Sequence, residues 1–212
     1  MFIPRHPVVE NQFCSYGAVT SSANAAGVGG VVAYAGSVVW LDPDATNQEP
    51  IVYKMAYNSS AYTPFGFAMQ KVKMGYHQVH PTGFMMPGDL GSSDVIAQSS
   101  YDSNGDIAGT KEAPLGVAHL GIWDTVHYTC VMTDSVIGAT DNMNPGDELF
   151  AAADEAKVTN STNAADGNTD KATGDRCSTV QVGVVVKGAS LAKCQANFNN
   201  TTLYPIRIKI LV

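Results

Sequence analysis

Histidines are the side chains of this sequence that could hold a metal ion, and there are five: His6, His77, His80, His119 and His127. His77 and His80 are three residues apart, a spacing that turns their rings to opposite faces of a strand. His119 and His127 fall in two separate expected strands. Because zinc requires ligands that converge on one point, we expect neither a metal site nor a cofactor.

Acidic and amide side chains alternate at Asp102, Asn104 and Asp106, as the oxygen ligands of a calcium-binding loop do. The glycine of such a loop is out of place here, and Ala113 stands where the final glutamate is required. We therefore expect a solvated hairpin turn centred on Asn104-Gly105.

Nucleophilic catalysis would require a serine in a Gly-x-Ser-x-Gly elbow or a cysteine beside a histidine. The sequence offers neither in a suitable context, since His127 and Cys130 point to opposite faces of their expected strand. No glycine-rich loop opens a helix that could hold a phosphate. We expect no catalytic residues and no enzymatic activity.

The four cysteines, Cys14, Cys130, Cys177 and Cys194, lie far apart and form no Cys-x-x-Cys pair. Free and mostly buried thiols are the expectation for such a pattern in a reducing compartment. Cys177 with Cys194 is the one disulfide pairing that we consider, because both flank the last expected β-region.

The composition limits the partners that the chain could have. Its 212 residues carry a net charge of -7, which argues against a nucleic-acid footprint, since that requires a basic face. No segment approaches the length of a membrane span, and Met1 to Pro7 lacks the apolar core of a signal peptide. Charged residues make up only 15%, against about 25% in ordinary soluble domains. Such a surface is common in secreted proteins and in subunits that bury much of their exterior against neighbours.

Strands must position all of these side chains, because a strand phrase with a central glycine occurs three times. Its copies are Pro64-Phe65-Gly66-Phe67-Ala68, Pro114-Leu115-Gly116-Val117-Ala118 and Gln181-Val182-Gly183-Val184-Val185. Alternating apolar residues place one row of side chains on one face of a sheet, and a glycine within such a run marks a bulge or a close backbone approach. Further strand signals cover 31–41, 51–55, 94–98, 115–120, 122–132, 180–187 and 206–212, and one helical turn is plausible at 191–197. The sequence predicts an all-β fold with a small β-barrel or β-sandwich core and long loops.

The first 30 residues are expected to form an extended N-terminal arm. Pro4 and Pro7 oppose regular structure, and residues 21–30 are small and bury little. Apolar anchors punctuate this segment: Phe2, Ile3, Phe13 and Tyr16. They are the candidate contacts with a partner, with fraying of an ordinary terminus as the alternative. Residues 31–212 are then the β-rich domain, either one unit or two intertwined β-subdomains.

The order of motifs in the C-terminal half resembles that of tailed-bacteriophage head decoration (cement) proteins. The motifs are Asn144-Pro145-Gly146-Asp147 leading into Glu148-Leu149-Phe150-Ala151, then Ala156-Lys157-Val158-Thr159, Val182-Gly183-Val184-Val185 and a final alternating strand at 206–212. The segments Ser37-Val38-Val39-Trp40-Leu41-Asp42 and Phe65-Gly66-Phe67-Ala68 resemble the same rhythm in duplicated form.

The resemblance implies a virion structural protein that binds the outside of a phage head and bridges subunits of the major capsid protein. It also implies self-association, with a trimer favoured, and an N-terminal arm that grips the shell, on particles assembled in the host cytoplasm. A tail or fibre attachment protein is the alternative within the structural class. A β-barrel enzyme or ligand-binding module is the third hypothesis.

Overall fold

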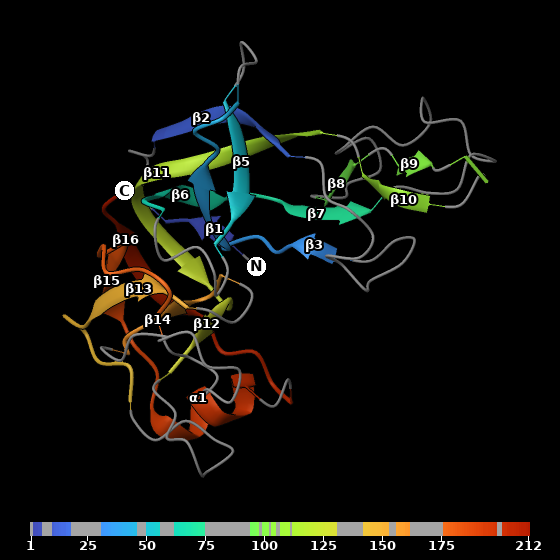
Figure 1. Ribbon diagram of the computed structural model, residues 1–212. Helices are drawn as coiled ribbons and strands as arrows, with labels where there is room; N and C mark the ends of the chain where they lie inside the picture. Colours follow the sequence, from blue (N-terminus) through green and yellow to red (C-terminus); the bar gives the residue numbers. More distant parts are fainter. Residues whose placement is uncertain are drawn as a thin grey trace.

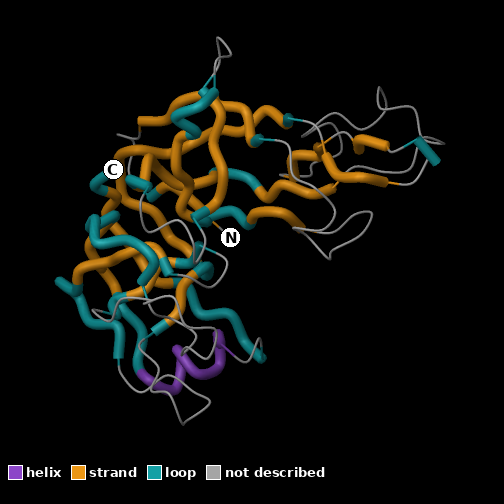
Figure 2. The backbone as a smooth tube through the Cα atoms, viewed as in Figure 1, coloured by secondary structure: helices purple, strands orange, loops and turns teal. Residues whose placement is uncertain are grey.

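The computed structural model describes residues 2–5, 10–17, 31–45, 50–55, 62–74, 94–97, 99–101, 103–104, 107–110, 112–130, 142–152, 156–161, 176–198 and 201–212. The described part consists mostly of strands, with one short helix, which confirms the all-β prediction. Figures 1 and 2 show a barrel, a second sheet beside it and a projection of short strands.

Five strands close into a barrel with the ring order β11-β2-β5-β4-β6 and back to β11. They are β2 (Glu10–Tyr16), β4 (Val38–Leu41), β5 (Ile51–Lys54), β6 (Pro64–Ala68) and β11 (Ala113–Thr125). All neighbours in the ring are antiparallel except β2 and β5. Alternate residues of these strands meet in one buried cluster that includes Cys14, Val39, Val52, Leu115 and Val117. The barrel prediction is therefore confirmed.

A second sheet continues from the C-terminal half of β11 through β16 (Ile206–Ile210), β15 (Gly183–Lys187), β13 (Glu148–Ala151), β14 (Val158–Thr159) and β12 (Tyr128–Thr129). Its buried face includes Trp123, Leu149, Val185, Ile208 and Ile210. The helix α1 (Leu191–Phe198) lies at the end of this sheet, close to β12, where one helical turn was expected (Figure 1).

A group of short strands projects from the barrel, to the right in Figure 1. It contains a three-stranded sheet of β3 (Val31–Ala33), β7 (Lys71–Met74) and β8 (Asp94–Ala97), and a hairpin of β9 (Ser99–Tyr101) and β10 (Ile107–Thr110). In the hairpin, Ile107 pairs with Tyr101, and Ser103 and Asn104 lie in a turn between them, so the hairpin prediction is confirmed; Gly105 lies outside the described residues.

Two of the three glycines of the repeated phrase mark close backbone approaches, as expected. A Cβ on Gly66 would lie 2.8 Å from the carbonyl oxygen of Ala118, and one on Gly183 would lie 2.8 Å from that of Lys209. A Cβ on Gly116 would meet only the side chain of Met69. The first two copies of the phrase are themselves neighbours, because β6 pairs with β11 at Phe67 and Ala118.

The prediction of an arm separate from the core is wrong for residues 2–5 and 10–17. β1 (Phe2–Pro4) and β2 both pair with β11, and β2 is one of the five barrel strands. A boundary at residue 30 therefore does not separate a tail from the folded domain. Residues 18–30 lie outside the described part of the chain.

Candidate interaction surface

The two N-terminal strands pair with different halves of β11. Phe2 lies opposite Thr125 and Pro4 opposite Trp123, whereas β2 pairs with the first half of β11, with Tyr16 opposite Ala113. The other edge of β11 is taken by β16 where β1 pairs and by β6 where β2 pairs. Among the described strands, only β5 reaches the outer edge of β2, at Ser15 and Tyr16, and none pairs with the outer edge of β1. These two open edges are where a further strand could add.

Phe2 fixes β1 to the fold by aromatic stacking. Its ring lies 4.5 Å from that of Trp123 at an interplanar angle of 7°, and 5.8 Å from that of Phe67 at 12°. Only 9% of Phe2 is exposed. A side chain buried against its own core is not available to a partner, so the structure does not support Phe2 as a contact residue.

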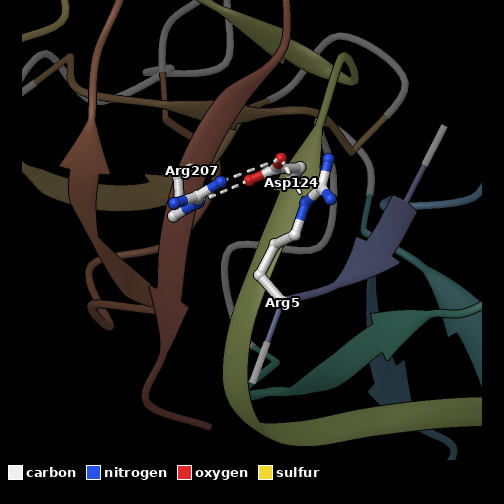
Figure 3. A network of polar contacts seen from close by, with 3 residues as sticks. All are labelled: Arg5, Asp124 and Arg207. Carbon is white, nitrogen blue, oxygen red and sulfur yellow. Dashed lines mark hydrogen bonds and ion pairs between the residues drawn. The ribbon is translucent and has the colours of Figure 1, made fainter. Parts of the chain in front are cut away.

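An ion-pair network fixes the chain immediately after β1 (Figure 3). The Asp124 carboxylate accepts a hydrogen bond from Arg5 Nε at 2.6 Å and one from Arg207 Nε at 2.8 Å. Burial alone would raise the pKa of Asp124, but the hydrogen bonds and charges of Arg207 and Arg5 outweigh it and hold this pKa below its usual value. The carboxylate thus joins the N-terminal strand, β11 and β16.

The other three candidate contacts divide into one buried and two exposed side chains. Tyr16 is 2% exposed, its hydroxyl accepts a hydrogen bond from the Lys54 backbone N–H, and burial raises its pKa. Ile3 is 37% exposed and Phe13 is 64% exposed, the largest exposed fraction among the apolar side chains described. Ile3 and Phe13 therefore stay as candidates, and Phe2 and Tyr16 do not.

One serine and one histidine, 90 residues apart, meet in the structure in a way the sequence did not indicate. Ser37 Oγ lies 3.1 Å from His127 Nε2, and the ring of Tyr34 stacks on the imidazole at 5.2 Å. Ser37 is fully buried and its Oγ also accepts the Tyr34 backbone N–H. A hydroxyl that no solvent or substrate reaches cannot serve as a nucleophile in this conformation, so the pair joins β4 to the start of β12.

His119, another of the five histidines, is bound to a neighbouring strand. Its Nδ1 lies 2.8 Å from the Phe65 carbonyl oxygen, which can only accept, so Nδ1 carries the proton. Its buried Nε2 has no hydrogen-bond partner in the described part of the chain. No group of three potential metal ligands occurs among the described residues, and His6, His77 and His80 lie outside them.

The expectation of free, buried thiols is confirmed for Cys14 and Cys177 and wrong for Cys130 and Cys194, and the one pairing considered, Cys177 with Cys194, is also wrong. Cys194, on α1, forms a disulfide with Cys130, which follows β12. Cys14 and Cys177 are free and buried, and burial raises the pKa of each thiol to about 11. The pairing depends on α1 packing against β12, a long-range contact that cysteine spacing does not reveal.

An open pocket of about 440 Å³ lies where the bridge between Met143 and Ala189 meets the start of α1. Asn142 Oδ1 accepts the Leu191 backbone N–H at 2.7 Å there, which supports the first turn of the helix. Lys187 is the one ionisable side chain among the described lining residues. The pocket brings together no acid–base or nucleophile–base pair, and we assign it no chemistry.

Comparison with known proteins adds no assignment, since no protein-family model and no curated protein matches the sequence. Among the described residues, α1 is the only helix, and its eight residues are too few to cross a membrane.

Proposed function

We propose that this chain is a virion structural protein that decorates the outside of a phage head and stabilises it by bridging capsid subunits. The observation that carries the proposal is the open outer edge of each N-terminal strand, with Ile3 exposed on β1 and Phe13 exposed on β2. An exposed strand edge offers unpaired backbone groups to a neighbouring chain. An exposed phenylalanine supplies the apolar contact that central interface residues provide.

The proposal also draws on the rigidity of the strand that carries this edge. Phe2 and the Arg5–Asp124–Arg207 network hold the N-terminal strands against β11, so the edge is preorganised before a partner arrives. Preorganisation lowers the conformational entropy that binding must overcome. The low content of charged residues also lowers the cost of binding, because few ionised groups would have to be desolvated.

The role is non-enzymatic, and self-association accompanies it, with a trimer favoured. The main partner is the major capsid protein. The resemblance of the motif order to decoration proteins is the basis for naming the capsid protein and a trimer. We assign the contact with the capsid to the open edges of β1 and β2.

Particles from the phage stock that encodes the chain provide the test. We expect the protein to sediment with heads in a density gradient, and an antibody against it to label the capsid surface in negative-stain images. Adding the purified chain to heads that lack it should restore this labelling. A protein that stays at the top of the gradient, or labels only tails and fibres, would rule out decoration.

Two surface variants connect the test to the proposed edge. Phe13→Ser should lower the fraction bound to heads at least about tenfold, as is typical of a central interface aromatic. Leu203→Ser is the matched control, since Leu203 is 53% exposed and lies in the loop between α1 and β16, outside β1 and β2. Equal binding by both variants would place the contact elsewhere.

A further inference from the structure

The outer face of the β4–β5 pair is buried at one end and partly exposed at the other. At one end, Met55 donates its backbone N–H to the Val38 carbonyl, and both side chains belong to the core shared with the second sheet. The next residue pair on this face is Trp40 opposite Tyr53, and both are half-buried. Trp40 and Tyr53 are therefore the first side chains on this face that are partly exposed.

Three aromatic rings are in contact at this point. Tyr62, which is 38% exposed, stacks on Trp40 with ring centroids 3.7 Å apart and an interplanar angle of 8°. Tyr53 packs against the same indole at 5.6 Å, and its ring also covers Gly17 so closely that a Cβ there would overlap it. Neighbouring backbone and side chains thus fix the rings in place.

A carboxylate lies beside these rings. Asp42 follows Trp40 by two residues on the same strand face, and its backbone N–H donates to the Ile51 carbonyl, which continues the register. Burial raises the pKa of Tyr53, and the negative charges of Asp42 and Glu112 raise it further. We call Trp40, Tyr53, Tyr62 and Asp42 the aromatic–acidic surface.

We propose that the aromatic–acidic surface binds an arginine side chain of a partner protein. A guanidinium is planar, stacks on aromatic faces and presents five donors that match carboxylate oxygens. An ammonium would use the charge but not the planar stacking, and a neutral sugar would use the rings but not the charge. The combination of stacked rings with the Asp42 carboxylate selects arginine over both. This inference goes beyond the decoration role and does not depend on it.

Tryptophan signals allow a direct test, because the chain has only two tryptophans. Trp123 is 1% exposed and its Nε1–H donates to the Leu120 carbonyl, whereas Trp40 lies at the proposed surface. The probe is the peptide acetyl-Gly-Arg-Arg-Gly-amide, titrated into the ¹⁵N-labelled full chain while the two indole N–H signals are followed by NMR. Trp40→Phe assigns the two signals. We expect the Trp40 signal to move and the Trp123 signal to stay.

Variants and competing ligands make the test specific. Tyr62→Ala and Asp42→Asn should each weaken peptide binding about tenfold, while Tyr204→Ala and Glu148→Gln, which change an exposed aromatic and an exposed carboxylate elsewhere, should leave it unchanged. The dispersion of the full spectrum verifies that each variant is folded. The proposal fails if the arginine peptide moves neither indole signal or if the lysine analogue binds as tightly. It also fails if maltotriose moves the Trp40 signal and the peptide does not.

Discussion

Phe2 and Phe13 lie on the same N-terminal course along β11, yet Phe2 is 9% exposed and Phe13 is 64% exposed. One ring is part of the core and the other faces solvent. Their sequence surroundings do not distinguish them, because each is an apolar residue in a segment of low apolar content. The difference in exposure follows from the neighbours of each ring. Phe2 stacks on Trp123 and Phe67, whereas Phe13 is paired with Gly116.

Truncation of these two rings should therefore have unequal effects. We expect Phe2→Ala to lower the free energy of unfolding by about 3 kcal/mol, as is typical of a buried aromatic. Phe13→Ala should change it by less than about 0.5 kcal/mol, since it removes little buried area. Urea denaturation followed by circular dichroism measures both. Equal losses would mean that β1 is not held by the stack that its geometry shows.

The strands of the core could be predicted locally, and the N-terminal strands could not. Residues 206–210 alternate apolar and polar side chains, and residues 51–53 are β-branched or aromatic, and both segments become strands that match the expected ranges closely. β1 has three residues and includes Pro4, so its own pattern carries little strand signal. It is a strand because β11 offers it an edge, and that edge is more than 100 positions away in the sequence.

Two predicted strands at 115–120 and 122–132 proved to be largely one. β11 continues through Gly121, whose φ of 119° lies in a region that glycine tolerates and other residues rarely adopt. This glycine lets a single strand serve both the barrel and the second sheet. Conversely, the predicted strand at 31–41 is divided into β3 and β4, with Gly36 at a φ of 97° between them.

The candidate site was predicted only in part, for the same reason. Ile3 and Phe13 stand out as apolar residues in a sparse segment, and both are exposed. Asp124 is 119 positions from Arg5 and 83 from Arg207, and Ser37 is 90 positions from His127. No local sequence pattern could reveal contacts between residues so far apart.

The Asp124 network should make stability depend on pH in the acidic range. The pKa of Asp124 in the folded protein lies below its unfolded value, which is about 3.9. Its contribution is therefore complete above about pH 4 and is lost as the pH falls through the folded pKa. Near pH 7, Asp124→Asn should be about 1 to 2 kcal/mol less stable than the native chain, a modest value because both guanidinium groups reach solvent.

This difference should narrow when urea denaturation is repeated at decreasing pH below about 4. Glu148→Gln removes an exposed carboxylate and serves as the control, whose stability should remain parallel to that of the native chain. A constant gap between the native chain and Asp124→Asn from pH 7 to pH 2.5 would contradict the assigned ion pairs.

Reduction of the disulfide should destabilise the second sheet and α1. Cys130 and Cys194 are 64 residues apart, and closing a loop of that length stabilises the folded state by about 4 kcal/mol in the chain-entropy model. A reductant should therefore lower the Tm of the native chain markedly. It should lower the Tm of Cys177→Ala by a similar amount, because Cys177 is a free thiol.

Thiol alkylation under denaturing conditions, followed by mass spectrometry, checks the pairing itself. Without reductant, two of the four cysteines should be modified, Cys14 and Cys177, and all four should react after reduction. In the native state these two thiols should react slowly at pH 7, since burial raises the pKa of each to about 11 and little thiolate forms. Four modified cysteines without reductant would show that the disulfide is absent.

Gly188 should be the least replaceable glycine near α1. A Cβ at this position would overlap the carbonyl oxygen of Met143, which belongs to the bridge between Met143 and Ala189 and accepts the Ala189 N–H. Backbone cannot move aside as a side chain can, so Gly188→Ala should lower the free energy of unfolding by about 3 kcal/mol.

Gly116→Ala is the matched control, because its Cβ would meet only the flexible side chain of Met69, at 3.1 Å from Sδ. We expect the control to stay within about 1 kcal/mol of the native chain, helped by the lower entropy of its unfolded state. Urea denaturation of the two variants side by side decides the matter, and a Gly188→Ala protein as stable as the control would mean that the chain at the Met143 bridge is free to shift.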